Sequence, residues 1–288
     1  MLLAEVMLNK VMLKKECSIE ATYSSGEKTH GKQNQMPPGK FQFFSAHLDG
    51  EVLHICFRKN LLEHLADLSK RDIISNFANQ VSKSGDAKVI LLNSDFRETG
   101  CEAYTKFFLK GKQTRDLTDL HKLCNITSQL VLGLMGLDQM VIHACQGNVI
   151  SLFLNISLAC DYRIAADNTL FCNPYLDLGM IPMGGGPFFL PRMMRAGNLW
   201  ETLLLNKDID AQKALKIGLV DCVVSSSDLD KTALDTAHRF ADNNAGTLAG
   251  LKRLVNFSKR DLKAYFELEK EEIFKRLNSQ DVAKYLMN

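Results

Sequence analysis

Strong net charge, closely paired cysteines and long apolar runs are all missing from this sequence of 288 residues. Its 35 lysines and arginines are balanced by 33 aspartates and glutamates, which leaves a formal charge of +2. A surface for nucleic acid or for an anionic membrane would need a larger excess of positive charge. The composition therefore predicts neither nucleic acid nor a membrane as a partner.

No two of the eight cysteines form the C-x-x-C spacing that is typical of zinc or redox sites. We therefore expect no metal, and free, mostly buried thiols in a reducing compartment. Residues 1–13 are apolar but carry Glu5 and Lys10, lack a small-residue cleavage site and are too short to cross a bilayer. These observations predict a cytoplasmic protein.

Three regions are predicted from the composition along the chain. Residues 21–40 are polar, rich in Gly, Ser, Gln and Pro, and show no apolar period, so 1–40 is expected to be an N-terminal arm that is partly flexible. A core at 41–224 follows, and 225–288 is a C-terminal helical region. No internal repeat is present.

The core begins with a predicted hairpin and continues with alternating helices and strands. Two apolar segments, 41–48 and 51–57, flank Asp49-Gly50, which suits a two-residue turn. Helical spacing predicts helices at 67–81 and 117–137, and apolar runs predict strands at 88–93 and 140–145. This order is typical of right-handed parallel crossovers.

The second half of the chain is predicted to be mostly helical. After an apolar run at 149–159, short strands are expected at 160–166 and 168–172. Helices are then predicted at 188–196, 199–205, 210–217, 229–241, 247–257 and 262–277. Asp210 can cap the third of these helices and Gly218 can end it in the left-handed conformation.

Three motifs follow one another at fixed spacing: Gln146-Gly147, Ala159-Cys-Asp161, and Asn173-Pro174 with Gly179, Pro182 and Gly184–Gly186. Together they resemble the core of the crotonase (enoyl-CoA hydratase/isomerase) superfamily, and a fainter likeness covers about 41 to 257. The resemblance implies an α/β, crotonase-like (ClpP/crotonase) fold of repeated β-β-α units in two near-perpendicular sheets, with a C-terminal helical region. It also implies a homotrimer or a hexamer.

The resemblance implies an acyl thioester as the substrate, attached to coenzyme A or to an acyl-carrier protein, with no separate cofactor. Reactions at the α-carbon of a thioester pass through an enolate, which two backbone N–H groups can stabilise. The positions that supply these groups in the family correspond to Cys101 and Leu152. Hydratases have glycines where this chain has Ser151-Leu152-Phe153, so the backbone here is more crowded.

The residues at the two catalytic positions of hydratases depart from the family's pattern. Hydratases carry glutamates there, one to activate water and one to deliver a proton, whereas this chain has Asn155 and Tyr175. Asn155 could hold a water or a substrate carboxylate, and Tyr175 could donate a proton, but both could equally be satisfied core groups. Asp177 could replace the missing carboxylate or be a solvated loop residue.

Other polar residues have a structural interpretation beside the functional one. Asp161 is expected to be architectural, and His143 a hydrogen-bonded core residue rather than a base. Cys101 and Cys172 would be nucleophiles only with a base nearby. For the phosphates of coenzyme A the candidates are Arg97, Lys106, Lys252 and Arg253.

Three functions remain open from the sequence. The first is an enoyl-CoA hydratase or isomerase, a lyase or isomerase that uses an oxyanion hole. The second is a thioester decarboxylase of the polyketide-assembly type, in which departing CO₂ supplies the electrons and no strong base is needed. The third is a catalytically inactive subunit for acyl-thioester binding or assembly. Likeness of fold alone does not choose among them.

Overall fold

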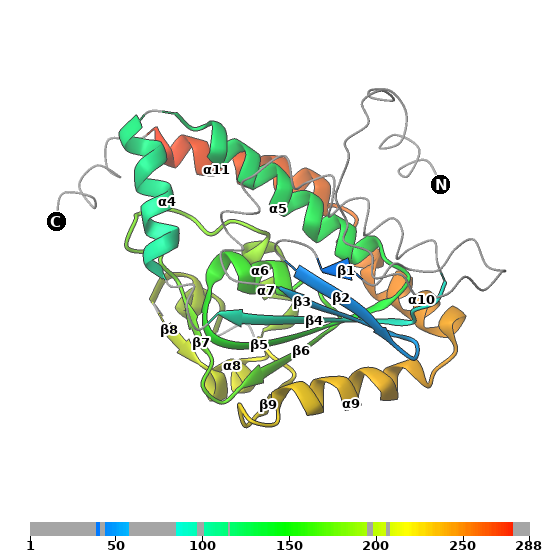
Figure 1. Cartoon of the computed structure of the whole chain (residues 1–288). Helices are drawn as coiled ribbons and strands as arrows, with labels where there is room; N and C mark the ends of the chain where they lie inside the picture. Colours follow the sequence, from blue (N-terminus) through cyan, green and yellow to red (C-terminus); the bar gives the residue numbers. More distant parts are fainter. Residues whose placement is uncertain are drawn as a thin grey trace. The chain divides into compact units, whose positions relative to one another are not determined.

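The computed structural model describes residues 39–40, 44–57, 85–96, 101–114, 116–194, 198–205 and 208–278, all within one compact unit, Asn34–Asn288. The strands are β1 Gly39–Lys40, β2 Phe44–Asp49, β3 Val52–Phe57, β4 Val89–Phe96, β5 Met140–Ile150, β6 Tyr162–Ala166, β7 Leu170–Cys172, β8 Asp208–Asp210 and β9 Cys222–Val224. The α-helices are α4 Cys101–Thr114, α5 Thr118–Gly136, α6 Ser151–Ser157, α7 Gly186–Met193, α8 Ala211–Ile217, α9 Leu229–Ala241, α10 Ala245–Asn256 and α11 Leu262–Leu277 (Figure 1). A π-helical turn, Glu201–Leu205, and a 3-10 turn, Phe257–Lys259, complete the described elements.

The long strand β5 belongs to two sheets. Its first part lies between β4 and β6, parallel to both, in a sheet of order β1-β2-β3-β4-β5-β6-β9. Its last three residues pair instead with β7, which is antiparallel to β8. Gly147 lies where β5 changes partners and has φ +80°, a conformation that costs glycine little because it has no Cβ.

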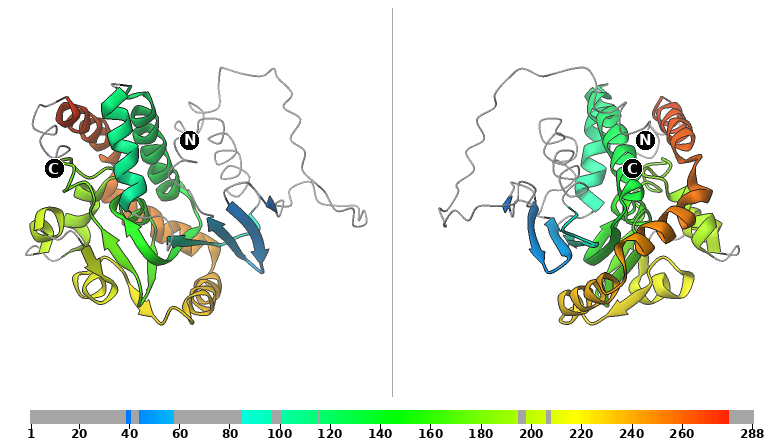
Figure 2. Two further views of the ribbon diagram at one scale, coloured as in Figure 1. Left: turned by 60° about the vertical axis from the view of Figure 1, so that its left-hand side comes forward. Right: turned by 90° about the vertical axis from the view of Figure 1, so that its right-hand side faces the viewer.

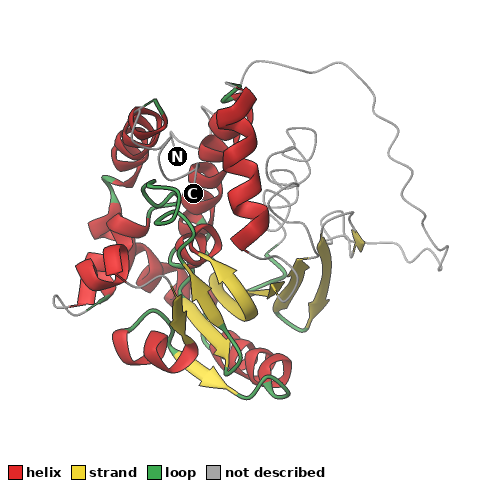
Figure 3. Ribbon diagram, turned by 90° about the vertical axis from the view of Figure 1, so that its left-hand side faces the viewer, coloured by secondary structure: helices red, strands yellow, loops and turns green. Residues whose placement is uncertain are grey.

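Alternate residues of the main sheet contact different helices. Val89, Leu91 and Ile142 pack against α9, while Ile90, Leu92 and Val141 face a larger core formed with α4, α5, α6, α7 and α11. Figure 3 shows the strands in yellow and the covering helices in red. Within the larger layer α5 packs against both α4 and α11 (Figure 2). Both faces of the parallel strands are therefore covered, as is usual for parallel sheets.

Most of the predicted helices and strands are confirmed, although the ends of several of them are shifted. The hairpin forms, but its turn residues are Gly50 and Glu51, because Asp49 still pairs with Val52. The apolar run at 149–159 is helical only over α6, and the first two residues of that run finish β5. Helices α9 and α11 have the predicted bounds, and the predicted caps of α8 are confirmed: Asp210 accepts from the Lys213 N–H and Gly218 is left-handed.

Among the described elements, α4, β1, β8, β9 and the 3-10 turn were not predicted from the sequence. The predicted helix at 67–81 lies outside the described residues, as does the arm apart from β1. Among the described helices, none combines the length and apolar character that crossing a membrane requires.

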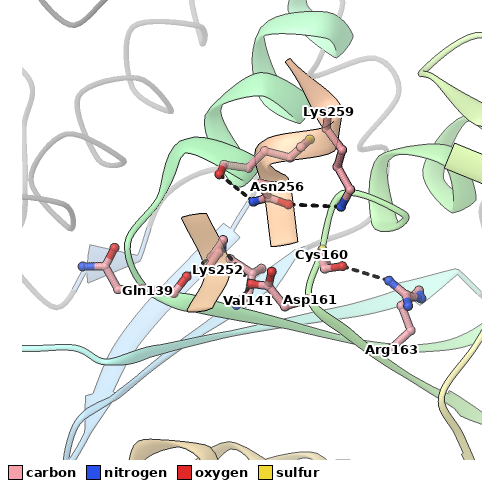
Figure 4. A network of polar contacts seen from close by, with 9 residues as sticks. Gln139, Val141, Cys160, Asp161, Arg163, Lys252, Asn256 and Lys259 are labelled. Atoms are coloured by element: carbon pink, nitrogen blue, oxygen red, sulfur yellow. Dashed lines mark hydrogen bonds and ion pairs between the residues drawn. The ribbon is translucent and has the colours of Figure 1, made fainter. Parts of the chain in front are cut away.

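A buried ion pair joins α10 to the sheet (Figure 4). Lys252 is 4% exposed; its Nζ lies 2.7 Å from Asp161 Oδ2 and donates to the Gln139 carbonyl at 2.7 Å. The same Asp161 oxygen accepts from the Val141 N–H at 2.8 Å. Asp161 is therefore architectural, as predicted. Lys252 is fully engaged by these two contacts, which removes it as a candidate for the phosphates of coenzyme A.

His143 lies in the middle of β5, buried, with its Nε2 3.2 Å from Ser94 Oγ. Burial, helped by the charge of Arg163, lowers the pKa of His143 to about 4. The ring is therefore neutral and hydrogen-bonded in the folded protein at neutral pH. This is the core role predicted for it.

This buried histidine should make the protein lose stability in mild acid. The unfolded chain takes up a proton near the ordinary histidine pKa of 6.5, but the folded chain does so only near pH 4. Stability is therefore complete above pH 6.5 and falls by about 3 kcal/mol as the pH drops to 4. His143→Gln should flatten this part of the urea-unfolding profile, whereas the exposed His121→Gln should leave it in place. An unchanged slope in His143→Gln would contradict the assignment.

Candidate active site

The two predicted oxyanion amides both follow strands that end at the same edge of the main sheet. β4 and β5 are parallel neighbours, so their carboxyl ends meet there. α6 begins directly after β5 and carries Leu152 in its first turn; α4, the next described element after β4, begins at Cys101. The first N–H groups of a helix have no partner within the helix. This edge is also where open α/β sheets commonly bind their ligands.

The start of α6 carries a buried hydroxyl without a partner. Ser151 is 3% exposed, and its Oγ makes no hydrogen bond to any described residue. No side chain caps α6 at this end. A buried polar group that is left unpaired costs free energy, so such a group calls for an explanation, and a ligand is one. Leu152 and Phe153, beside it, are buried in the larger core.

Asn155 holds the glycine segment 184–186 against α6. Its Nδ2 donates to the Met183 carbonyl at 2.8 Å. A Cβ at Gly186 would lie 2.6 Å from Asn155 Oδ1, so any other residue there would displace the Asn155 amide. The family's glycine-rich motif is thus explained at this position by close packing. Asn155 is therefore a buried amide that is hydrogen-bonded to the backbone.

Tyr175 is also engaged with the backbone. Its side chain is 2% exposed, and its hydroxyl donates to the Leu203 carbonyl at 2.9 Å. Burial raises the pKa of Tyr175. The phenol therefore keeps its proton and directs it to a main-chain acceptor in the π-helical turn.

Asp177 lies on the surface, close enough to Cys101 for its charge to act on that thiol. Asp208 of β8 acts on the same thiol. Asn155 and Tyr175 are held by the Met183 and Leu203 carbonyls, whereas the charge of Asp177 acts on the Cys101 thiol in the direction that raises its pKa. Of the three predicted catalytic side chains, Asp177 is the exposed one.

Glu269 of α11 is a residue of this region that the sequence did not reveal. It is 8% exposed, and its carboxylate accepts from Gly184 N at 2.8 Å, Gly185 N at 2.9 Å and Tyr265 Oη at 3.0 Å. Burial raises the pKa of Glu269, against these three hydrogen bonds, which lower it. Gly184 and Gly185 both have positive φ, +98° and +87°, so their N–H groups can converge on one side chain. The charged stretch around Glu269 gave no sign of this role, because charged helical stretches are usually solvated.

Glu269 also borders a recess between α5 and α11. Its other lining residues are Cys124, Asn125, Ser128, Phe266, Glu267, Lys270 and Ile273. None of the five predicted site residues lines this recess. Among the described residues, no cluster of three His, Cys, Asp or Glu side chains could hold a metal ion.

The remaining candidates for binding coenzyme A phosphates differ in position. Arg253 forms an exposed ion pair with Asp138 at 2.7 Å, and Lys106 forms one with Glu102 at 3.5 Å on α4. Exposed pairs of this kind contribute little stability and can be exchanged for a phosphate. Arg97 lies outside the described residues. Lys106 lies five positions along the helix that begins at Cys101, closer in sequence to the candidate site than Arg253.

Replacing Glu269 with glutamine should destabilise the fold. The amide would turn an NH₂ group toward one of the glycine N–H groups, which loses a hydrogen bond and places two donors face to face. The expected loss is about 1–3 kcal/mol in urea unfolding. Glu267→Gln is the matched control on α11, exposed and paired with Lys270 of the same helix, and should change stability by less than about 0.5 kcal/mol. Equal effects of the two substitutions would show that the carboxylate contacts are unimportant.

Comparison with known proteins identifies the family to which this chain belongs. The model of the Enoyl-CoA hydratase/isomerase family matches residues 101–287, more than half of the chain. The chain belongs to this family. The matched range begins at Cys101 and includes all five predicted site residues. The crotonase resemblance of the sequence is thereby confirmed.

The most similar relatives of this hydratase/isomerase-family chain include several enzymes of acyl-CoA metabolism. Carnitinyl-CoA dehydratase of Citrobacter koseri is 29% identical over 152 residues, covering 53% of this chain and 56% of that protein. A probable mitochondrial enoyl-CoA hydratase 2 of Arabidopsis thaliana is 23% identical, covering 87% of this chain and 79% of its own length. For most of these relatives the match spans about half of their length, as with the short-chain-enoyl-CoA hydratase of Clostridium acetobutylicum, 33% identical over 46% of its length.

Solved structures confirm the fold of this family member. Enoyl-CoA hydratase from Bacillus halodurans superposes with a TM-score of 0.73 at 19% identity, covering 85% of this chain and 99% of that one. DspI from Pseudomonas aeruginosa gives a TM-score of 0.63 at 19% identity, covering 88% of this chain and all of that one. The predicted crotonase-like α/β fold with a helical C-terminal region is therefore confirmed.

Proposed function

We propose that this chain binds an acyl thioester, with coenzyme A or an acyl-carrier protein as the carrier, at the carboxyl ends of β4 and β5. The thioester carbonyl would accept hydrogen bonds from the N–H groups of Cys101 and Leu152. One observation carries the proposal: the buried Ser151 hydroxyl at the start of α6 has no partner among the described residues. An oxygen acceptor bound there would satisfy it. The names of the relatives, which act on CoA thioesters, support the same substrate class.

Donors fixed in place stabilise the negative charge that develops on a thioester oxygen when an enolate forms. Such an arrangement needs backbone shape more than particular side chains. A proton must still be removed or delivered at the α- or β-carbon, and the exposed Asp177, whose charge acts on the Cys101 thiol, is the proposed acid-base residue. On this proposal the protein is a weak hydratase or isomerase that uses one carboxylate in place of two.

A second candidate function, thioester decarboxylation, is favoured by the engagement of Asn155 and Tyr175. The Asn155 amide has no basic site, and the Tyr175 phenol, whose pKa is raised by burial, keeps its proton and donates it to a main-chain carbonyl, so neither acts as a base. Loss of CO₂ from a malonyl-type thioester leaves an enolate directly and needs only the oxyanion donors. The third candidate, an inactive binding or assembly subunit, needs neither a base nor a carboxylated substrate.

We further propose that the chain assembles as a homotrimer or hexamer in the cytoplasm. Several large apolar side chains are exposed on and after α10, namely Leu251, Leu254, Val255 and Phe257, between 57% and 74% exposed. Contiguous apolar surface of this kind is typical of protein interfaces. The seven described cysteines are all free, in keeping with a reducing compartment.

Binding should be visible as thermal stabilisation by acyl-CoA esters. At about 100 times its dissociation constant, a ligand adds about 2.7 kcal/mol to the free energy of unfolding. Ser151→Ala should leave the free protein as stable or more stable, but weaken acyl-CoA binding by about 2- to 12-fold, because one hydrogen bond of about 0.5–1.5 kcal/mol is lost. Thr127→Val is the matched control: it also removes a buried, unpartnered hydroxyl, but from α5. Equal losses in both variants, or no stabilisation by any acyl-CoA, would reject the site.

The reaction is tested by comparing hydration with decarboxylation. Crotonyl-CoA hydration should be slow and should be lost in Asp177→Asn, with Asp167→Asn as a surface control. CO₂ release from malonyl-CoA that persists in Asp177→Asn would support decarboxylation instead. Rapid hydration that survives Asp177→Asn would contradict both proposals. Binding without either reaction would favour the inactive subunit.

A further inference from the structure

A cysteine and a histidine of β3 are hydrogen-bonded to each other, away from the candidate site. His54 Nε2 lies 3.3 Å from Cys56 Sγ. The two residues are two positions apart on one strand, so their side chains share the face of Val52, which packs against α9. Both are partly exposed. A thiol with a base in hydrogen-bond reach, open to solvent, has the two parts that nucleophilic catalysis requires.

Neighbouring strands surround the imidazole with polar groups. His47 of β2 is directly opposite His54, and the two rings meet edge to face with their centroids 4.7 Å apart. Asn93 of β4 is directly opposite Cys56, and its Nδ2 donates to Asp230 of α9 at 2.8 Å. The Oδ1 of Asn93 is buried and makes no hydrogen bond to any described residue. A spare acceptor is therefore present beside the pair.

The imidazole of the pair is neutral at neutral pH. Burial, followed by the charge of His47, lowers the pKa of His54. Three groups act in the opposite direction: Asp230, Asn93 and Asp49. Burial, followed by the charge of Asp230, raises the pKa of Cys56, so the thiol is also neutral. The thiol can then react only while it passes its proton to a base, and the ring nitrogen 3.3 Å away is that base.

An acyl thioester is the electrophile that suits this pair. Cys56 is the last but one residue of β3, which is parallel to β4, so it lies near the edge at which the acyl thioester is proposed to bind. Exchange of one thioester for another replaces a C–S bond by a C–S bond, so no further reactant is needed. The acyl donor rests on the proposed function, whereas the hydrogen-bonded pair does not.

We propose that Cys56 accepts the acyl group of an acyl thioester, with His54 as the general base. The Cys56 sulfur attacks the thioester carbonyl carbon while its proton passes to His54 Nε2. The new C–S bond forms, the bond to the carrier sulfur breaks, and the leaving thiolate takes the proton from His54. The products are S-acylated Cys56 and the free thiol of the carrier, with no change of oxidation state.

The purified full-length chain is incubated with octanoyl-CoA, whose saturated acyl group has no double bond to which a thiol could add. Intact mass and peptide mapping should find one octanoyl group on Cys56, with one free CoA released for each group. Neutral hydroxylamine should remove the group, because it is a thioester. Cys222, a partly exposed cysteine on β9, is the internal control and should be acylated at least about tenfold more slowly.

Variants test each member of the pair. Cys56→Ala, or Cys56→Ser if the first variant does not fold, should lose the thioester adduct. His54→Gln keeps a polar side chain but removes the base, so it should slow acylation at least about 100-fold. His121→Gln, which replaces an exposed histidine on α5, is the matched control and should be acylated like the parent chain.

The pH dependence of alkylation distinguishes a base from a merely structural histidine. The rate at which iodoacetamide alkylates Cys56 should be nearly constant between about pH 6.5 and 8, because the neutral ring accepts the thiol proton throughout this range. In His54→Gln the rate should rise about tenfold per pH unit, as expected for an unassisted thiol that must first ionise. The same steep rise in the parent chain would show that His54 is not the base.

The proposal is overturned if Cys222 is acylated as fast as Cys56, if the adduct resists hydroxylamine, or if His54→Gln is acylated at the parent rate. Thermal stabilisation by octanoyl-CoA is measured separately in Cys56→Ala, which cannot be acylated at this position. Acylation of the parent chain without stabilisation of this variant would reject the proposed function and support the pair. Stabilisation of the variant without acylation of the parent would support the proposed function and reject the pair.

Discussion

The arrangement of this protein depends on the point at which β5 leaves one sheet for another. Gly147, with φ +80°, allows the strand to pair with β4 and β6 before it and with β7 after it. This change of partners fixes where α6 begins and places Ser151 and Leu152 beside the carboxyl end of β4. It also brings β7, and with it Cys172 and the Tyr175 segment, to the same edge. A side chain at position 147 would be strained in this conformation.

Around that edge, buried polar side chains form hydrogen bonds that join separate segments of the chain. Asn155 fastens α6 to the glycine segment, Tyr175 fastens the turn after β7 to the π-helical turn, and Glu269 fastens α11 to Gly184 and Gly185. Each contact satisfies main-chain groups that would otherwise be buried and unpaired. Asn155 and Tyr175, the residues at the family's glutamate positions, therefore stabilise the frame of the candidate site, and the proposed reaction relies instead on the backbone, on Asp177 or on the substrate.

The fold was largely predictable because its signals are local. Apolar segments located β2 and β4, helical spacing located α5, α9 and α11, and capping chemistry located the ends of α8. The short strands β8 and β9 were missed because three residues carry no readable period, and their pairing with β7 and β6 is a tertiary effect. Helix α4 was missed because its sequence mixes apolar, charged and glycine residues without a clean stripe.

Of the candidate site, only the positions that belong to a recognised family motif could be predicted from the sequence. Motif spacing led to Leu152, Asn155 and Tyr175, but not to what their side chains contact, because Met183 and Leu203 are 28 residues away from Asn155 and Tyr175. Glu269 lies 84 and 85 residues from the glycines it binds, so no local pattern could connect them. A single sequence lists candidate groups, and only the fold shows which of them are already engaged.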